Sequence, residues 1–253
     1  MATFKGPNRT SATKSAPPRC LVAIADDLLA NFVDVLLNHG EYARKRARTL
    51  DDAGEQLRQW EPHLAIVELA LEGGRGAELI NRATPHGPLP VIILAPRGGM
   101  RTRLEAFERG ADDVLSIPFP PEELIARALA LVKRRHGITV KFRPSIRIGH
   151  LELDILAQKV RVDHHEIDLT SREDALLYVL AAAAGHPVGR EQLLTYMYGD
   201  DALVLSSNVI DRLVVELRRK LAVADPATGF IETSPGGYLL RIVEPSERRQ
   251  ANV

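Results

Sequence analysis

The sequence predicts an α/β protein with two domains: a doubly wound, five-stranded parallel sheet, and after it a smaller domain of three helices and a hairpin. Short apolar runs alternate with segments of helical periodicity along the first half of the chain. That alternation is typical of a parallel sheet with helices on both faces. The second half contains three amphipathic segments before a Gly-rich turn. A chain of 253 residues also exceeds what one small core needs.

Composition excludes several classes of protein. Lys plus Arg and Asp plus Glu both number 33, so net charge gives no argument for or against a nucleic-acid partner. Cys20 is the only cysteine in the sequence, which excludes an internal disulfide and a thiolate zinc site, and we expect it to be buried. The apolar runs are too short to span a bilayer, and residues 1–19 have no signal-peptide core. We therefore expect a cytoplasmic protein without a membrane partner.

The strands of the first domain are predicted from apolar runs that suit burial on both faces. They cover Leu21 to Ala25, Leu64 to Leu69, Val91 to Ala95 and Val114 to Ile117. The second strand along the chain is expected at Arg44 to Arg48, where positive charges protect an exposed sheet edge from pairing. Helical spacing predicts helices around 28–38, 51–60, 76–83, 100–109 and 121–134.

Ligands of such sheets bind beyond the carboxyl ends of the strands. Asp26 and Asp27 follow the first strand, and Glu68 lies in the run at 64–69. Three carboxylates are a set that could hold one Mg²⁺ through oxygen ligands. Ala95 and Ile117, which end the last two strands, add no polar group to this rim.

The segments Pro62 to Leu69 and Gly110 to Phe119 resemble the signature segments of the receiver domains of response regulators. The resemblance covers residues 20–135. It implies that Glu68 occupies the place of the phosphorylated aspartate. It also implies that Ala95 replaces a Ser or Thr, that Ile117 replaces a Lys, and that Val114 replaces an aromatic switch residue.

These departures agree in their physical consequence, because phosphoryl transfer depends on positioning and on neutralising the transferring oxygens. Glu68 shifts the acceptor oxygen by one methylene, Ala95 cannot donate a hydrogen bond, and Ile117 supplies no cation. We therefore expect a degenerate, atypical receiver that is not phosphorylated and has no cofactor. Two alternatives stay open. Glu68 could act as a fixed charge that imitates phosphorylation, or Asp26 and Asp27 could retain Mg²⁺, since adjacent carboxylates repel unless neutralised.

The resemblance also implies a dimer face, which in the DNA-binding subfamily is formed by the fourth helix, the fifth strand and the fifth helix. Charged residues at the matching positions are predicted to pair across a homodimer. They are Arg103, Asp112, Asp113, Glu123 and Arg127. Exposed ion pairs contribute little individually, so the prediction depends on their number.

The second domain is expected at residues 148–243, after a linker at 136–147 that contains Gly137 and Pro144. Alternating apolar residues from Ile146 to Leu169 predict short antiparallel strands. The segment Asp163-His164-His165-Glu166 marks a hairpin turn, and because adjacent strand residues point to opposite faces, it does not favour a metal site. A disordered basic tail is expected at 1–19 and a second tail at 244–253.

Three helices and a hairpin complete this domain. Thr170 and Glu173 form a predicted capping box at the start of the first helix. The second helix begins near Arg190 and finishes around 198–199, and the third covers 207–221. Residues 230–233 and 238–240 flank a Gly-rich turn. This order is that of a winged helix-turn-helix, whose third helix enters the major groove of DNA.

Several motifs in this order resemble the DNA-binding domain of the OmpR/PhoB family; they are Leu169-Thr170 with Glu173, Gly185 to Leu193, Ser207 to Asp211, Leu217 to Leu221 and Gly236 to Tyr238. The resemblance implies a transcription regulator of a two-component system, with RNA polymerase as a partner of the loop 199–206. Leu213 stands where the family commonly has His or Tyr, Glu216 where it has a basic residue, and Pro235 where it has arginine. Each missing cation removes a phosphate contact.

The third helix of this domain supplies most of the predicted DNA contacts. We expect Arg212 and Arg219 to contact base edges or phosphates, Arg218 to bind phosphate, and Val215 to meet a thymine methyl group. Thr170, Arg190 and Asn208 are predicted to donate to the DNA backbone. Glu216 would repel phosphate unless it accepts from a cytosine amino group or pairs with Arg212.

The sequence thus predicts a transcription regulator that binds double-stranded DNA as a homodimer and acts independently of aspartyl phosphorylation. The alternative is a regulator that works by protein–protein interaction with weak or no direct DNA binding, which the missing basic residues favour. The sequence contains no motif that places a nucleophile and a general base together in an active-site pocket, so it does not predict an enzyme.

Overall fold

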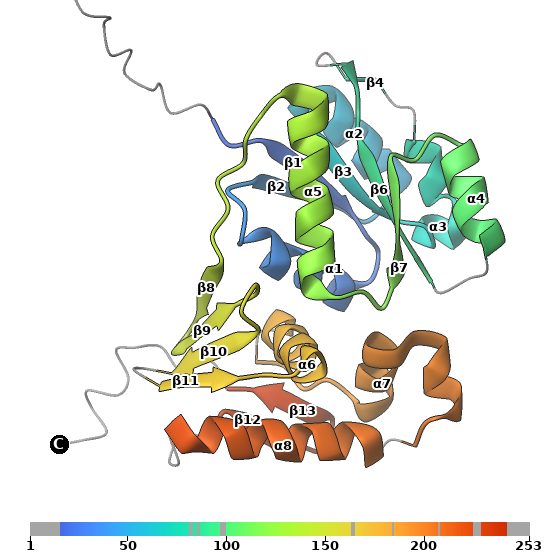
Figure 1. Ribbon diagram of the computed structural model, residues 1–253. Coiled ribbons are helices and arrows are strands. Elements are labelled where there is room, and N and C mark those ends of the chain that lie inside the picture. Colours follow the sequence, from blue (N-terminus) through green and yellow to red (C-terminus); the bar gives the residue numbers. More distant parts are fainter. Residues whose placement is uncertain are drawn as a thin grey trace, which may run out of the picture.

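The computed structural model describes residues 16–80, 83–84, 87–96, 100–162, 165–183, 185–206, 208–224 and 229–241. Most of the predicted basic tail, the tail at 244–253, and Asp163 and His164 of the predicted turn lie outside the described residues. The described chain forms two domains, one above the other in Figure 1.

The first domain is built on a parallel sheet with the strand order β2-β1-β3-β6-β7. Alternate residues of β1 enter two separate cores, with Cys20 and Val22 on one face and Leu21 and Ala23 on the other. Burial on both faces explains why these runs are apolar throughout, and the predicted doubly wound sheet is confirmed. The strands are β1 (Arg19–Ala23), β2 (Ala43–Ala47), β3 (Leu64–Glu68), β6 (Val91–Pro96) and β7 (Asp113–Ile117).

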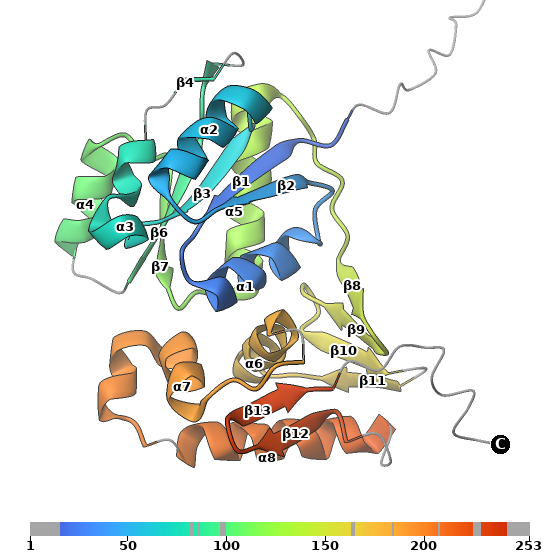
Figure 2. The ribbon, with the colours of Figure 1, turned by 180° about the vertical axis from the view of Figure 1, so that it is seen from behind.

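Helices cover both faces of this sheet (Figure 2). α1 (Asp27–Leu37) and α5 (Pro121–His136) pack on the face that contains Cys20. α2 (Leu50–Trp60) and α4 (Met100–Glu108) lie on the other. The expected burial of Cys20 is confirmed, and burial raises the pKa of its thiol. The arginine-rich β2 is an edge strand, as predicted.

The prediction of a helix over residues 76–83 is wrong. The structure has instead a four-residue α3 (Leu71–Gly74), a 3₁₀ turn η1 (Gly76–Leu79) and the two-residue strands β4 (Ala83–Thr84) and β5 (Gly87–Pro88). Glu72 and Gly73 have φ angles of 46° and 75° inside α3. A Cβ on Gly76 would lie 2.1 Å from the carbonyl oxygen of Glu68. The segment therefore makes a tight turn against the end of β3, which a regular helix could not make.

The second domain has the predicted winged-helix order. Its four-stranded antiparallel sheet is followed by three helices and a hairpin. The predicted capping box at Thr170 is confirmed. Across the described parts of both domains, no helix is long and apolar enough to cross a membrane. The elements are β8 (Ser145–Ile148), β9 (Leu151–Asp154), β10 (Lys159–Val162), β11 (His165–Asp168), α6 (Ser171–Ala182), α7 (Arg190–Tyr198), η2 (Gly199–Val204), α8 (Asn208–Ala224), β12 (Ile231–Ser234) and β13 (Gly237–Leu240).

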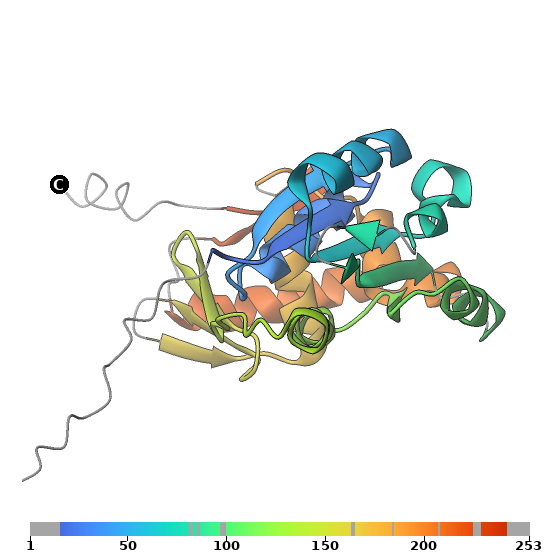
Figure 3. The same ribbon diagram turned by 90° about the horizontal axis from the view of Figure 1, so that it is seen from above.

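The two domains contact each other directly, because α1 packs against α6 and one set of buried side chains continues from the receiver core into the winged-helix core. In Figure 3, where α5 is seen end-on, the second domain lies beneath the first. The linker also lies against the first domain. The N–H of Arg143 donates to the carbonyl of His39 at 2.7 Å, and the N–H of Glu41 donates to the carbonyl of Lys141 at 3.2 Å.

Candidate nucleic-acid interface and receiver rim

The outer face of α8 is the candidate DNA-contacting surface. Ile210, Val214 and Leu217 are buried in the domain core, which fixes the rotation of the helix. The predicted contact residues Asn208, Arg212, Val215 and Arg219 are exposed together on the opposite face. α8 lies on the side of the second domain away from the receiver (Figures 1 and 2), so the receiver does not cover this face.

On this face Glu216 has a different ion-pair partner from the one considered in the sequence analysis. Glu216 pairs with Arg219 at 3.0 Å rather than with Arg212, because the i,i+3 partner lies closer on the helix surface. Arg212 is exposed and has no ion pair to another described residue. Among the described residues of this face, Arg212 is thus a predicted contact residue whose charge is not paired with a carboxylate.

Two other predicted DNA contacts are held by the wing. Nε of Arg218 donates to the carbonyl of Ile231, and its Nη2 donates to Thr233, both at 2.8 Å. Nε of Arg190 donates to Asp211 at 2.7 Å, and both guanidinium groups lie over the ring of Tyr238. The hydroxyl of Tyr238 also donates to Asp211 at 2.6 Å, and this bond, with that of Arg190, lowers the pKa of Asp211. Arg190 and Arg218 thus position the hairpin relative to α7 and α8.

Thr170 likewise has a local role. Its hydroxyl accepts from the N–H of Glu173 at 3.3 Å, as in a capping box, and the Nζ of Lys220 reaches the Glu173 carboxylate at 2.7 Å. Burial by itself would raise the pKa of Glu173, but the Lys220 ammonium and the Thr170 bonds together lower it. The buried pair joins α6 to α8. The capping-box motif could be seen in the sequence, whereas the partner from α8 could not.

The carboxylates of the receiver rim are all engaged by the chain itself. Oε2 of Glu68 accepts from the N–H of Ala25 at 2.9 Å, and Asp27 pairs with Arg48. Oδ1 of Asp26 accepts from the N–H of Leu29 at 2.7 Å as the N-cap of α1. Among the residues described, no three Asp, Glu, His or Cys side chains converge as a metal site. The rim in this arrangement does not fit Mg²⁺, which needs a set of converging oxygens.

Three further residues predicted for the receiver rim lie on β6 and β7. Ala95 and Val114 are buried in β6 and β7, and Ile117 is half-buried at the end of β7. None of these side chains can donate a hydrogen bond or supply charge to Glu68.

The rim also touches the second domain, which the sequence did not reveal. The hydroxyl of Tyr196 in α7 donates to Oδ1 of Asp26. Further along the contact, Nδ1 of His39 donates to the carbonyl of Arg143 at 2.8 Å, so its Nε2 accepts from the Tyr178 hydroxyl at 2.7 Å. Burial lowers the pKa of His39. A capping aspartate and an isolated tyrosine carry no sequence signal that they meet across domains.

Among the described residues, four of the five charged residues predicted for a dimer face, all but Arg103, have ion pairs within the chain. Nη1 of Arg127 contacts Asp113 at 2.6 Å, and the same guanidinium contacts Glu123. Asp112 is nearly buried, since it accepts from the N–H of Val91 at 3.0 Å and pairs with Arg135. Close neighbours along β7 and α5 satisfy one another. Arg103 is exposed on α4, beside the exposed apolar side chains of Leu104 and Phe107.

Comparison with known proteins accounts for both domains. Residues 22–129 match the response regulator receiver domain, and residues 164–240 match the C-terminal domain of transcriptional regulatory proteins. The transcriptional regulatory protein PrrA of Mycobacterium tuberculosis is 38% identical over 232 residues, which are 89% of this chain and 97% of PrrA. The virulence transcriptional regulatory protein PhoP of Salmonella typhi is 30% identical over 225 residues, 88% of this chain and 99% of PhoP.

The crystal structure of the response regulator DrrB, a Thermotoga maritima OmpR/PhoB homologue, is 26% identical and covers 88% of this chain and 99% of its own, with a TM-score of 0.39. The chain spans nearly the whole length of the two regulators that it resembles in sequence. It therefore belongs to the OmpR/PhoB family of two-component response regulators, with a receiver domain joined to a DNA-binding transcriptional regulator domain.

Proposed function

We propose that this regulator binds double-stranded DNA through the outer face of α8, dimerises through its receiver domain, and acts without aspartyl phosphorylation. The observation that supports this most is the 2.9 Å hydrogen bond from the N–H of Ala25 to the Glu68 carboxylate. The side chain at the phosphoacceptor position is turned onto the β1 side of the rim. Catalysis of phosphoryl transfer needs an acceptor in line with the phosphodonor and cations around it.

The environment of Glu68 gives a second reason. Ala95 lies near the end of β6, which is next to β3, and Ile117 ends β7, the strand beyond β6; neither side chain supplies a hydrogen-bond donor or a cation. A fixed charge at Glu68 that imitates phosphorylation would need a side chain that responds to it, yet Ala95 and Val114 are buried and apolar. The rim therefore favours one constant state over a phosphate-driven switch.

The exposed arginines of α8 support the DNA-binding part of the proposal. Arg212 and Arg219 lie on the same outward face as Asn208 and Val215. The Arg219–Glu216 pair is largely exposed, and exposed pairs are weak, so a phosphate can displace Glu216 from Arg219. With few cations on one helix, tight binding requires two copies on repeated half-sites.

DNA fragments selected from a genomic pool test this part of the proposal. Gel shifts at increasing salt are expected to show that Arg212→Ala weakens binding about tenfold and lowers the salt slope by about one. Asp51→Asn, a change of an exposed residue on α2, serves as the control and leaves the affinity unchanged. Absence of any shift at low salt would contradict DNA binding.

The phosphorylation part has a separate test. Wild-type protein and Glu68→Ala are incubated with acetyl phosphate and Mg²⁺, and intact mass is measured. We expect no added phosphate on either protein, and unchanged DNA affinity. Phosphate on the wild type that is absent from Glu68→Ala would show that Glu68 is an acceptor after all.

A second candidate function is regulation through a protein partner. Leu203 and Val204 in η2 are 90% and 85% exposed, although both are large and apolar. They lie in the loop 199–206, which the family resemblance assigns to RNA polymerase. Exposed apolar side chains at one loop favour a protein contact. Loss of transcriptional effect in Leu203→Ser with unchanged DNA binding would favour this role.

A further inference from the structure

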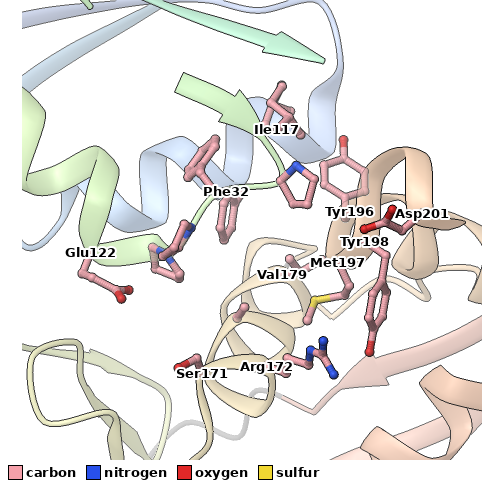
Figure 4. A pocket seen from close by; sticks show the side chains of 16 residues that line it. Phe32, Ile117, Glu122, Ser171, Arg172, Val179, Tyr196, Met197, Tyr198 and Asp201 are labelled. Carbon is pink, nitrogen blue, oxygen red and sulfur yellow. The ribbon is translucent and has the colours of Figure 1, made fainter. Parts of the chain in front are cut away.

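A cavity of about 350 Å³ lies between the two domains, beside the carboxyl end of β7. Figure 4 shows Phe32 and Ile117 on the receiver side, with Val179 and Met197 on the winged-helix side. Each domain supplies eight of the sixteen lining residues. Ligand sites of proteins are commonly apolar clefts of this size at domain interfaces, with a few polar groups.

Specific contacts hold the walls of this interdomain cavity. The Tyr196 hydroxyl is bonded to Asp26, which fixes the aromatic ring of one wall against the receiver. At Gly199 the backbone approaches Pro118 so closely that a Cβ there would lie 2.7 Å from the Cδ of Pro118. The domains therefore touch tightly beside the cavity, and the space is not a consequence of loose packing.

The lining is aromatic and carries more negative than positive charge. The aromatic rings are those of Phe32, Phe119, Tyr196 and Tyr198, and the charged residues are Glu122, Asp201 and Arg172. The guanidinium of Arg172 lies 5.2 Å from the ring centre of Tyr198, so this cavity already holds one cation on an aromatic face. Glu122 has no hydrogen bond or ion pair to another described residue. Its charge contributes, after burial, to raising the pKa of the neighbouring Asp174.

We propose that the interdomain cavity binds a small planar aromatic cation, with its ring between Phe32 and Met197 and its charge facing Glu122. The Glu122 carboxylate has no partner among the described residues, whereas the Arg172 guanidinium already lies over Tyr198, so the lining favours a positive ligand. Aromatic walls also attract cations through their ring faces. Ile117 contributes to the fit, because it adds an apolar side chain to the wall and no charge that would repel a cation.

The ligand would contact both domains at once and so stabilise the arrangement in which α1 packs against α6. Binding that depends on both domains links a chemical signal to the relative position of the DNA-binding domain. The inference does not depend on the proposed DNA contacts, since it concerns only the cavity and its lining.

The test uses two dyes in the absence of DNA. Thioflavin T is a planar aromatic cation, and 1-anilinonaphthalene-8-sulfonate is an aromatic anion. Fluorescence titration of the full chain is expected to show one saturable thioflavin T site and weaker binding of the anion. Glu122→Gln should weaken thioflavin T binding about fivefold, while the matched change Arg172→Gln should not weaken it.

Two variants test whether the dye binds in the interdomain cavity. Ala175→Phe fills the space from α6, and Ser171→Trp, at an exposed position, blocks the mouth without changing the core. Both should abolish the thioflavin T signal, with folding checked by circular dichroism. Binding that persists in the folded Ser171→Trp variant, or a stronger affinity for the anion, would overturn the proposal. Either outcome leaves the DNA-binding test unaffected, because no DNA is present.

Discussion

The arginines of the winged-helix domain fall into two groups, which differ in whether the guanidinium is bonded to the domain itself. Arg190 and Arg218 are bonded to Asp211, Ile231 and Thr233 and lie over Tyr238. Arg212 points outward on α8 and has no ion pair to another described residue. A side chain already bonded to its own fold contributes to stability, whereas an outward cation is available to phosphate.

Substitution of these arginines should separate stability from DNA binding. Arg218→Ala removes two hydrogen bonds to the wing and should lower the free energy of unfolding by about 1 to 2 kcal/mol. Arg212→Ala should change it by less than about 0.5 kcal/mol. Urea denaturation followed by circular dichroism measures both. Equal stability of the two variants would show that the wing does not depend on Arg218.

Asp174 on α6 is a buried carboxyl without a partner. Its side chain is 1% exposed, and neither oxygen has a hydrogen bond among the described residues. Burial raises its pKa to about 7, with smaller contributions from the charges of Glu122 and Asp154. The folded protein therefore keeps a proton on Asp174 that the unfolded chain releases near its ordinary pKa of 3.8.

Asp174 should make the protein less stable as pH rises. Its folded pKa is raised, so its contribution is fully present below about pH 4 and is lost as pH rises through about 7. Between about pH 5 and pH 8 this loss amounts to roughly 2 to 3 kcal/mol. Urea denaturation should show a smaller decline for Asp174→Asn.

Comparing wild type with Asp174→Asn separates the effect of Asp174 on the pH dependence of stability from the effects of other titratable groups. His39, whose pKa burial lowers, acts in the opposite direction in the acid range, but equally in both proteins. Glu191→Gln changes an exposed carboxyl of α7 and should follow the wild type. Identical pH profiles for Asp174→Asn and wild type would mean that Asp174 is ionised in the folded protein.

At the scale of the elements, the C-terminal end of α7 packs against the chain that follows β7. α7 is followed by Gly199, its C-cap, which has a φ of 59° and lies against Pro118. α7 also contains Tyr196, whose hydroxyl donates a hydrogen bond to Asp26 at the start of α1. The second helix of the DNA-binding domain is thus positioned by the carboxyl edge of the receiver sheet.

Gly199→Ala should weaken this contact. The new Cβ would lie 2.7 Å from Pro118 and would also require a left-handed backbone, so we expect a loss of about 2 to 3 kcal/mol in unfolding free energy. Gly137→Ala is the matched control, because Gly137 has a φ of 66° but nothing within 4 Å of a Cβ. Thermal denaturation should show a greater loss for Gly199→Ala; equal losses would indicate backbone strain alone.

At the scale of the whole molecule, the large apolar side chains that are exposed among the described residues of the receiver lie on α4. Leu104 and Phe107 are 50% and 46% exposed there. The acidic residues predicted for the dimer face, Asp112, Asp113 and Glu123, already pair with Arg135 or Arg127 of the same chain. Apolar contact by α4, more than ion pairs, would therefore stabilise the proposed dimer.

Phe107→Glu should accordingly raise the dissociation constant of the dimer about tenfold or more, since it places a charge at an apolar contact. Sedimentation equilibrium over a range of concentrations measures it. Leu156→Glu changes an exposed apolar residue of the second domain and should behave as wild type. A Phe107→Glu protein that dimerises as the wild type does would place the interface elsewhere.

The amino-acid sequence alone determined the two-domain architecture, the strand runs, the capping box at Thr170 and the outward face of α8. These features follow from apolar periodicity and local hydrogen bonding, which involve residues close in the chain. The same local reasoning failed at 76–83, where the close approach of Gly76 to Glu68 ends the helical pattern.

Only the tertiary structure decided which partner each polar group has. The bond from Tyr196 to Asp26 joins residues 170 positions apart, and that from His39 to Tyr178 joins residues 139 apart. The pairing of Arg218 with the wing and the cavity between the domains also depend on how separate elements meet. Such contacts leave no periodic signal in the sequence, because any exposed polar side chain has many partners until the domains are packed.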